Sequence, residues 1–225
     1  RFSEDLDYST RVMGPIKQID SLMETVVHSM DELLNEHGPF QVGLEPLLLK
    51  QPHPGDQKAY LVRVQFPEQR QPLCRLKVEI TVDEPILTPV EIRPVLHGFV
   101  EEIDARIPVY SLTEITAEKL RALLQSKARL QERGWGASRV CRDYYDLWNL
   151  LQVPGLKSPD LLPLLAEKCI VRDVSYESPN DFISEDLLDI ANAEWAQQLL
   201  PFVPDAPPAA ELLPQVQSFI LSIWE

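Results

Sequence analysis

The sequence predicts an α+β protein in which strands dominate the first half and helices make up the second. Between residues 1 and 82, several runs alternate apolar and polar side chains, which is typical of half-buried strands. After "IPVYSL", a short strand-like run at 107–112, apolar residues recur every three or four positions, as they do in amphipathic helices. This change in period divides the chain into two predicted domains, 1–111 and 112–225.

The opening run "RFSEDLDYST" is the first predicted strand. Its period of two puts the apolar residues Leu6 and Tyr8 on one face and Asp5 and Asp7 on the other. We expect the aromatic face to be buried and the two carboxylates to lie side by side. Because neighbouring like charges repel, the pair indicates either a bound cation or an acidic edge strand exposed to solvent.

A helix and three more strands follow in the first half. Helical spacing of apolar residues extends from Ile16 to Glu36 and ends before Gly38. The predicted strands are "QVGLEPLLLK", "KAYLVRVQF" and "LCRLKVEITV". The last of these alternates cleanly and displays Glu79 on its polar face, where it is either a solvent-facing residue or a third acidic ligand. A proline-rich connection, "DEPILTPVEIRPVLHGF", comes next.

The second half is predicted to be all-helical. Ser111 and Glu114 form a capping box that opens a helix over 112–131. "RGWG" breaks this helix; we interpret it as an interhelix connection with a packed Trp135, the alternative being a tryptophan that stacks on a base. Further helices are predicted at the following ranges: 138–152, 159–170, 184–200 and 209–224.

Composition restricts the possible partners and location. The 35 Asp and Glu residues outnumber the 21 Lys and Arg residues, for a net charge of −14. This balance argues against nucleic-acid binding through a broad basic surface, although not against a local basic groove. The sequence holds no apolar run long enough to cross a membrane. The three widely spaced cysteines indicate reduced thiols, so we expect a cytoplasmic protein.

Charged residues on two predicted helices are candidates for a site. Lys119 lies at the polar edge of the first helix, and its simplest interpretation is a solvated lysine. On the next helix, Arg142 and Asp146 are four positions apart, and Asp143 and Asp146 are three apart. A salt-bridged helix face explains that second pattern equally simply.

Together these stretches resemble the AbiEii/AbiGii toxin family of nucleotidyltransferases. "RFSEDLDYS" resembles the end of the family's first motif, in which DxD follows a glycine-rich stretch. "EITAEKLRALL" and "RDYYDLWNLL" are similar to its paired helical motifs, and "KVEITVDEPILTPVEIRPVLH" resembles the region between them. The resemblance covers nearly the whole chain. It implies a nucleotidyltransferase-like mixed-sheet core, 1–111, followed by a helical domain, 112–225, that carries the Lys and Asp motifs.

Such a family implies a cytosolic enzyme that uses Mg²⁺ or Mn²⁺ to transfer a nucleoside monophosphate from an NTP substrate to an acceptor. In toxin–antitoxin and phage-defence systems, including abortive infection, the expected acceptor is RNA, notably tRNA ends. A cognate antitoxin protein is the other expected partner. The resemblance assigns metal binding and catalysis to Asp5 and Asp7, and Glu79 falls where a third acidic ligand is expected.

The helical motifs supply the rest of the implied site. Lys119 matches the lysine that faces the triphosphate, and Asp143 matches the aspartate of the last motif, so both are assigned to catalysis. Arg142 and Asp146 are implied as supporting residues that help Lys119 bind the nucleotide. All of these residues are expected to converge in space.

One part of the family pattern is not in this sequence. The glycine and Ser/Thr loop that should precede DxD, and bind phosphates through backbone N–H groups, does not occur before Asp5. Because the chain starts at Arg1 inside a predicted strand, we expect the natural protein to extend upstream. Two alternatives remain: an interaction protein of this fold without catalysis, and a carboxylate–metal phosphodiesterase that cleaves nucleic acid.

Overall fold

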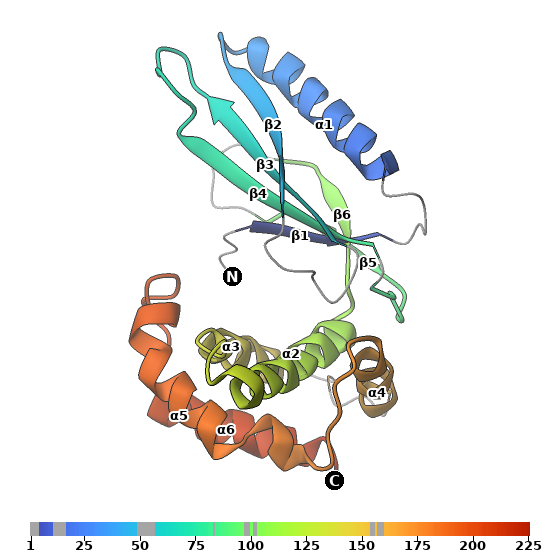
Figure 1. Cartoon of the computed structure of the whole chain (residues 1–225), viewed down its shortest axis with the longest axis vertical. Coiled ribbons are helices and arrows are strands. Elements are labelled where there is room, and N and C mark those ends of the chain that lie inside the picture. Colours follow the sequence, from blue (N-terminus) through green and yellow to red (C-terminus); the bar gives the residue numbers. More distant parts are fainter. Residues whose placement is uncertain are drawn as a thin grey trace. The chain divides into compact units, whose positions relative to one another are not determined.

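The computed structural model describes residues 5–10, 17–48, 57–82, 84–96, 100, 103–153, 156 and 160–225. The chain divides into two compact units, Arg1–Pro85 and Ile86–Glu225 (Figure 1). The first is a sheet with a helix, and the second is mainly helical, so the predicted α+β class is confirmed. The functional boundary predicted at residue 111 stays a prediction, because compact packing alone does not define a functional domain.

Strands of the first unit form one mixed sheet, in the order β1-β4-β3-β2 (Figure 1). β1 runs parallel to β4, whereas the β4–β3 and β3–β2 pairs are antiparallel. The predicted strands are therefore present, and the first lies directly beside the one that carries Glu79. Their bounds are β1 (Asp5–Ser9), β2 (Gln41–Leu47), β3 (Gln57–Gln65) and β4 (Cys74–Thr81).

Helix α1 (Lys17–Asn35) packs on one face of this sheet. Met23 and Val27 of the helix form a buried cluster with Tyr60, Val62 and Val78 of the strands. These strand residues are spaced by two along each chain, so they share the face that α1 covers. Neighbouring residues of β4, Glu79 included, consequently lie on the opposite face.

The apolar face of β1 is less buried than its pattern predicts. Leu6 is 37% exposed and Tyr8 is 51% exposed, so the expected burial is wrong for both. The reason is position: β1 lies at the edge of the described sheet, whereas the cluster under α1 is built from β3 and β4. An edge position is compatible with both interpretations of this segment, an acidic edge strand and a cation site.

The second unit begins with a short antiparallel pair, β5 (Glu91–Pro94) and β6 (Arg106–Val109). β6 corresponds to the predicted strand-like run. β5 lies inside the proline-rich connection and was not predicted, because a strand that ends in proline is short and lacks an amide donor there.

The predicted helices of the second half are all present, although the fourth, predicted at 184–200, is interrupted. Its α-helix ends at Glu194 and continues as one turn of π-helix. The elements are α2 (Leu112–Arg133), α3 (Val140–Leu151), α4 (Leu161–Val171), the 3₁₀ turn η1 (Pro179–Phe182), α5 (Glu185–Glu194), the π-turn η2 (Trp195–Leu199) and α6 (Ala209–Ser222).

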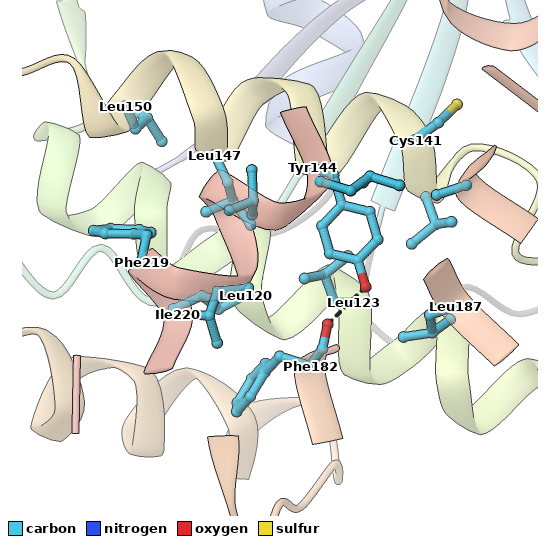
Figure 2. Packing of buried hydrophobic residues seen from close by; sticks show 14 of the residues in the cluster. Leu120, Leu123, Cys141, Tyr144, Leu147, Leu150, Phe182, Leu187, Phe219 and Ile220 are labelled. Atoms are coloured by element: carbon cyan, nitrogen blue, oxygen red, sulfur yellow. Dashed lines mark hydrogen bonds between the residues drawn. The ribbon is translucent and has the colours of Figure 1, made fainter. Parts of the chain in front are cut away.

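A single apolar cluster holds these helices together (Figure 2). Leu120 and Leu123 of α2 and Leu147 of α3 are fully buried within it. Tyr144 is buried too, and its hydroxyl donates a hydrogen bond to the carbonyl oxygen of Phe182 at 2.7 Å (Figure 2). This bond satisfies two polar groups that would otherwise be buried without partners.

Candidate functional site

The first candidate region is the pair of strands that carry the acidic residues. In the parallel register of β1 with β4, Asp7 is opposite Glu79 and Asp5 is opposite Lys77. Paired residues on adjacent strands lie about 4.8 Å apart and point to the same face. Because Val78 belongs to the cluster under α1, Asp7 and Glu79 share the face of the sheet that α1 leaves uncovered.

Glu79 already has a cationic neighbour on that face. The ammonium of Lys77, two residues earlier, lies 2.6 Å from a carboxylate oxygen of Glu79, whose side chain is 17% exposed. Glu79 is therefore ion-paired and only partly exposed, and its role as a third acidic ligand stays a prediction. The ion pair shows that the carboxylate is directed where a cation fits, and a bound metal would have to displace or share it with Lys77.

The chemistry of these residues fits a hard divalent cation, since Mg²⁺ prefers carboxylate oxygens. Asp7 is exposed and lies beside Glu79. The side chain of Asp5 lies outside the described part of the structure. Among the described residues no group of three His, Cys, Asp or Glu is arranged to hold a metal. The set Asp5, Asp7 and Glu79 therefore stays a prediction.

The second candidate region is a cluster of three charges between α2 and α3. The ammonium of Lys119 lies 2.8 Å from an oxygen of Asp143 and 2.7 Å from an oxygen of Asp146. All three side chains are largely buried, with exposed fractions of 16–17%. The idea of a solvated Lys119 is thus wrong, and the lysine links two helices instead.

Local sequence explains why these charges meet. Lys119 precedes Leu120, Asp143 precedes Tyr144, and Asp146 precedes Leu147, and each of these apolar neighbours is fully buried. The apolar residues set the rotation of both helices, which leaves the charged residues at the edge of the core. Asp143 and Asp146 are three positions apart and so lie on one face of α3.

Arg142 points to a different neighbour. Its Nε donates a hydrogen bond to the carbonyl oxygen of Gln198 at 2.7 Å, and its guanidinium lies 4.1 Å from the centre of the Phe202 ring. Gln198 belongs to the π-turn η2, so Arg142 connects the start of α3 to that turn. Its predicted part in nucleotide binding stays a prediction.

Sequence reasoning missed a buried ion network next to Lys119. Lys168 of α4 is fully buried and lies 2.8 Å from Glu114 and 2.8 Å from Glu118, both on α2. Burial favours the neutral amine, but the two carboxylates outweigh it and raise the pKa of Lys168 above its ordinary value. The sequence did contain a signal: Lys168 is the one basic residue of the mostly apolar helix "LLPLLAEKCIV".

Glu114 also shows that the predicted capping box is only half formed. The backbone N–H of Glu114 donates to the Ser111 hydroxyl at 3.1 Å, as predicted. Its carboxylate instead accepts the backbone N–H groups of Leu87 and Thr88, both at 3.0 Å. Burial raises the pKa of this carboxyl, but Lys168, Thr88 and the two amides together hold it below its ordinary value.

The two buried cysteines are poor candidates for nucleophiles. Cys141 and Cys169 are buried free thiols, and burial raises the pKa of each to about 11. Since the thiolate is the reactive form, neither is reactive near neutral pH.

These features define a class of protein: a mixed sheet whose parallel edge pair carries acidic residues, followed by helices that bring one lysine and two aspartates together. The chain is also similar to a described family over nearly its full length. The model of the nucleotidyl transferase AbiEii toxin family, type IV toxin–antitoxin system, matches residues 1–220 of 225. The chain therefore belongs to the AbiEii family. A comparison with curated proteins found no match.

Membership agrees with the resemblance found in the motifs and with the α+β fold. It makes the chain one of a family of nucleotidyltransferase toxins of type IV toxin–antitoxin systems. No helix within the described ranges combines the length and apolarity needed to cross a membrane.

Proposed function

We propose that this protein transfers a nucleoside monophosphate from an NTP to an RNA acceptor in a reaction that depends on Mg²⁺ or Mn²⁺. Family membership supports the transferase class. The observation that carries the proposal further is the cluster of Lys119, Asp143 and Asp146, which unites the two helical motifs at distances of 2.7–2.8 Å. The convergence of this cluster with Asp7 and Glu79 is part of the proposal.

Asp5, Asp7 and Glu79 would hold the metal, because they are the carboxylates of the paired strands β1 and β4. When bound, a divalent cation lowers the pKa of the acceptor hydroxyl and stabilises the leaving pyrophosphate oxygen. Glu79 would either complete the ligand set or accept the proton of that hydroxyl. Asp7, exposed on the edge strand, is the accessible member of the set.

Lys119 would bind the triphosphate as a point charge. Its two carboxylate partners hold the ammonium in one place, so little conformational entropy is lost when the phosphate binds. When the triphosphate binds, its phosphate oxygens would replace part of the contact that Lys119 makes with Asp143 and Asp146. Arg142, held at the start of α3 by Gln198 and Phe202, would add a second positive charge.

The family also supports a biological setting. A type IV system pairs the toxin with an antitoxin, so a cognate antitoxin is the proposed protein partner. We place the activity in the cytoplasm, where NTPs and tRNA occur, and in abortive infection as a form of phage defence.

The test is transfer of label into RNA. The protein is incubated with Mg²⁺, each α-labelled NTP in turn and total bacterial RNA. An Asp5→Ala plus Asp7→Ala variant serves as the control, and Asp104→Ala, exposed before β6, is the matched acidic control. We expect label in an RNA band with wild type and Asp104→Ala only.

The alternatives give other results. A non-catalytic interaction protein would incorporate nothing in a folded sample, and Mg²⁺ with NTP would not change its thermal stability. A phosphodiesterase would release RNA fragments without consuming NTP. Either result would refute the transferase.

A further inference from the structure

The segment between α2 and α3 exposes a tryptophan. Trp135 lies in the loop of residues 133–139, here called the Trp135 loop, and is 64% exposed. The sequence-based interpretation of a packed tryptophan is therefore wrong. A large, mostly exposed aromatic ring is suited to stacking, and stacking on nucleic-acid bases needs no particular base because each base has a π-face.

The Trp135 loop has a defined backbone. Gly134 and Gly136, on either side of the tryptophan, have φ angles of 74° and 101°, which L side chains rarely adopt. The N–H of Gly134 donates to Leu130 at 2.8 Å and so caps α2. The carbonyl of Gly136 accepts the Nε of Arg129 at 3.1 Å. Both neighbours of Trp135 are thus tied to α2, so the ring is presented from a fixed position.

The sequence around the Trp135 loop is basic, whereas the chain as a whole is acidic. Residues 126–142 contain five basic residues and one acidic residue, in a protein of net charge −14. Arg133 and Arg139 are exposed on either side of Trp135. The guanidinium of Arg133 lies 5.9 Å from the centre of the Trp135 ring. A basic segment with an exposed aromatic ring is the combination by which proteins bind single-stranded nucleic acid. Arg133 also pairs with Glu132 at 3.3 Å, so a phosphate would compete with that carboxylate.

The Trp135 loop leads directly to the proposed site. It ends at Arg139, and Asp143 lies in the first turn of α3. Along α2, Lys119 and Arg133 are fourteen residues apart in the sequence, which at 1.5 Å per residue is about 21 Å. About six stacked nucleotides at 3.4 Å each would cover that length. A strand whose end reaches Lys119 and Asp143 is therefore long enough to reach Trp135.

We propose that the Trp135 loop binds an unpaired, single-stranded segment of the RNA acceptor. Trp135 stacks on one base, and Arg133 and Arg139 contact phosphates on either side. Charge complementarity favours RNA over a protein partner, because most of this acidic chain would repel phosphate and this segment would not. The inference rests on the proposed function, since it assumes that RNA is the acceptor.

Binding is measured apart from catalysis. Fluorescence anisotropy of a labelled 12-nucleotide single-stranded RNA of mixed sequence is recorded with the complete protein in EDTA and without NTP. We expect Trp135→Ala to weaken binding about five-fold or more, and Trp135→Phe to keep it within about two-fold. Arg133→Gln plus Arg139→Gln should reduce the slope of log K against log salt by about 1.4.

Matched controls lie elsewhere on the surface. Ile170→Ala removes an apolar side chain that is 78% exposed on α4, and Arg70→Gln removes an exposed charge between β3 and β4. Neither should change RNA binding. Wild-type affinity in Trp135→Ala, or no RNA binding by wild type, would overturn the assignment of the Trp135 loop.

Transfer of labelled NMP distinguishes the two proposals. If wild type transfers label and Trp135→Ala binds RNA normally, the loop assignment fails and the transferase stands. If RNA binding depends on Trp135 but no nucleotide is transferred, the loop assignment stands and the transferase fails. If Trp135→Ala loses a protein partner and keeps RNA binding, the loop belongs to that partner and the inference is overturned.

Discussion

Lys119 shows how a single side chain depends on residues far from it in the sequence. Its ammonium lies within 2.8 Å of both Asp143 and Asp146, at 16% exposure. Charges held this close and partly out of water interact more strongly than surface pairs, and they lose more when one partner is removed.

Replacing Lys119 by Met distinguishes the contribution of this lysine to stability from its proposed contribution to catalysis. We expect Lys119→Met to lower the free energy of unfolding by about 1–3 kcal/mol, because two neighbouring carboxylates are left without their shared cation. Adding Asp146→Asn should restore part of that stability but none of the activity. Urea unfolding and NMP incorporation measure the two effects, with at least about 100-fold lower incorporation expected for both variants.

Lys58 is the matched control for Lys119. It pairs with Asp20 at 3.1 Å in the first unit and is 33% exposed. Lys58→Met should cost about 1 kcal/mol or less and leave incorporation unchanged. Wild-type incorporation by Lys119→Met would remove the lysine from the catalytic assignment.

Asp181 predicts a pH dependence of stability. Hydrogen bonds from Lys127 and from the backbone N–H groups of Glu177 and Ser178 lower its pKa from 3.8 to about 2. A carboxyl whose pKa is lowered by folding stabilises the protein above its unfolded pKa, and this contribution disappears as the pH falls from about 4 to about 2. Asp181→Asn should therefore destabilise by about 1–2 kcal/mol at pH 7.

The pH series makes this prediction specific. The difference in unfolding free energy between wild type and Asp181→Asn should shrink between pH 4 and pH 2.5 in guanidinium titrations. A constant difference over the range would mean that the Asp181 carboxylate does not titrate as described.

At the scale of elements, α2 is the helix on which the second unit is organised. Its apolar residues Leu120 and Leu123 enter the common core (Figure 2). Its acidic residues Glu114 and Glu118 bind Lys168 of α4. Because Lys119 follows Glu118 directly, the same contact that holds α4 also fixes the rotation of α2 that directs Lys119 to α3.

Lys168 is therefore predicted to be important for stability. Lys168→Met should destabilise the protein by about 3–5 kcal/mol, since the buried Glu114 loses its ammonium partner and Glu118 keeps Arg121 but loses Lys168. Glu167→Gln, at the exposed neighbouring position, should change stability by about 0.5 kcal/mol or less. Chemical denaturation of both variants tests this, and equal stabilities would contradict the described network.

At the scale of the whole molecule, the two units differ in the size of their cores. The buried cluster of the first unit contains Met23, Val27, Tyr60, Val62 and Val78. The cluster of the second unit extends from Ala117 to Ile220 and draws on every α-helix described there. A core of that size supports independent folding, whereas the smaller one is marginal by itself.

We predict that the fragment 86–225 folds alone. It should show a helical circular dichroism spectrum and a cooperative thermal transition. Tyr144→Phe removes the hydrogen bond to Phe182 and should lower stability by about 1–3 kcal/mol in both the fragment and the complete chain. A fragment without cooperative unfolding would show that the second unit needs the first.

Local patterns in the sequence were enough to predict most of the helices and strands. Alternation over β4 and helical spacing over α1, α2, α3, α4 and α6 depend on each residue's nearest neighbours, so they could be interpreted directly. The pairing of β1 with β4, which sets Asp7 opposite Glu79, was beyond these local patterns. Local patterns did not predict β5, a short strand that ends in proline, or the end of α5.

What the sequence by itself determined is therefore the order and type of the elements, the AbiEii resemblance and the motif residues. The tertiary structure decided which partners these residues have: Lys119 with two aspartates, Lys168 with two glutamates, and an exposed Trp135. The physical reason is that burial and ion pairing depend on chain segments brought together by folding. A local pattern shows that a side chain is charged or aromatic, but not what will surround it.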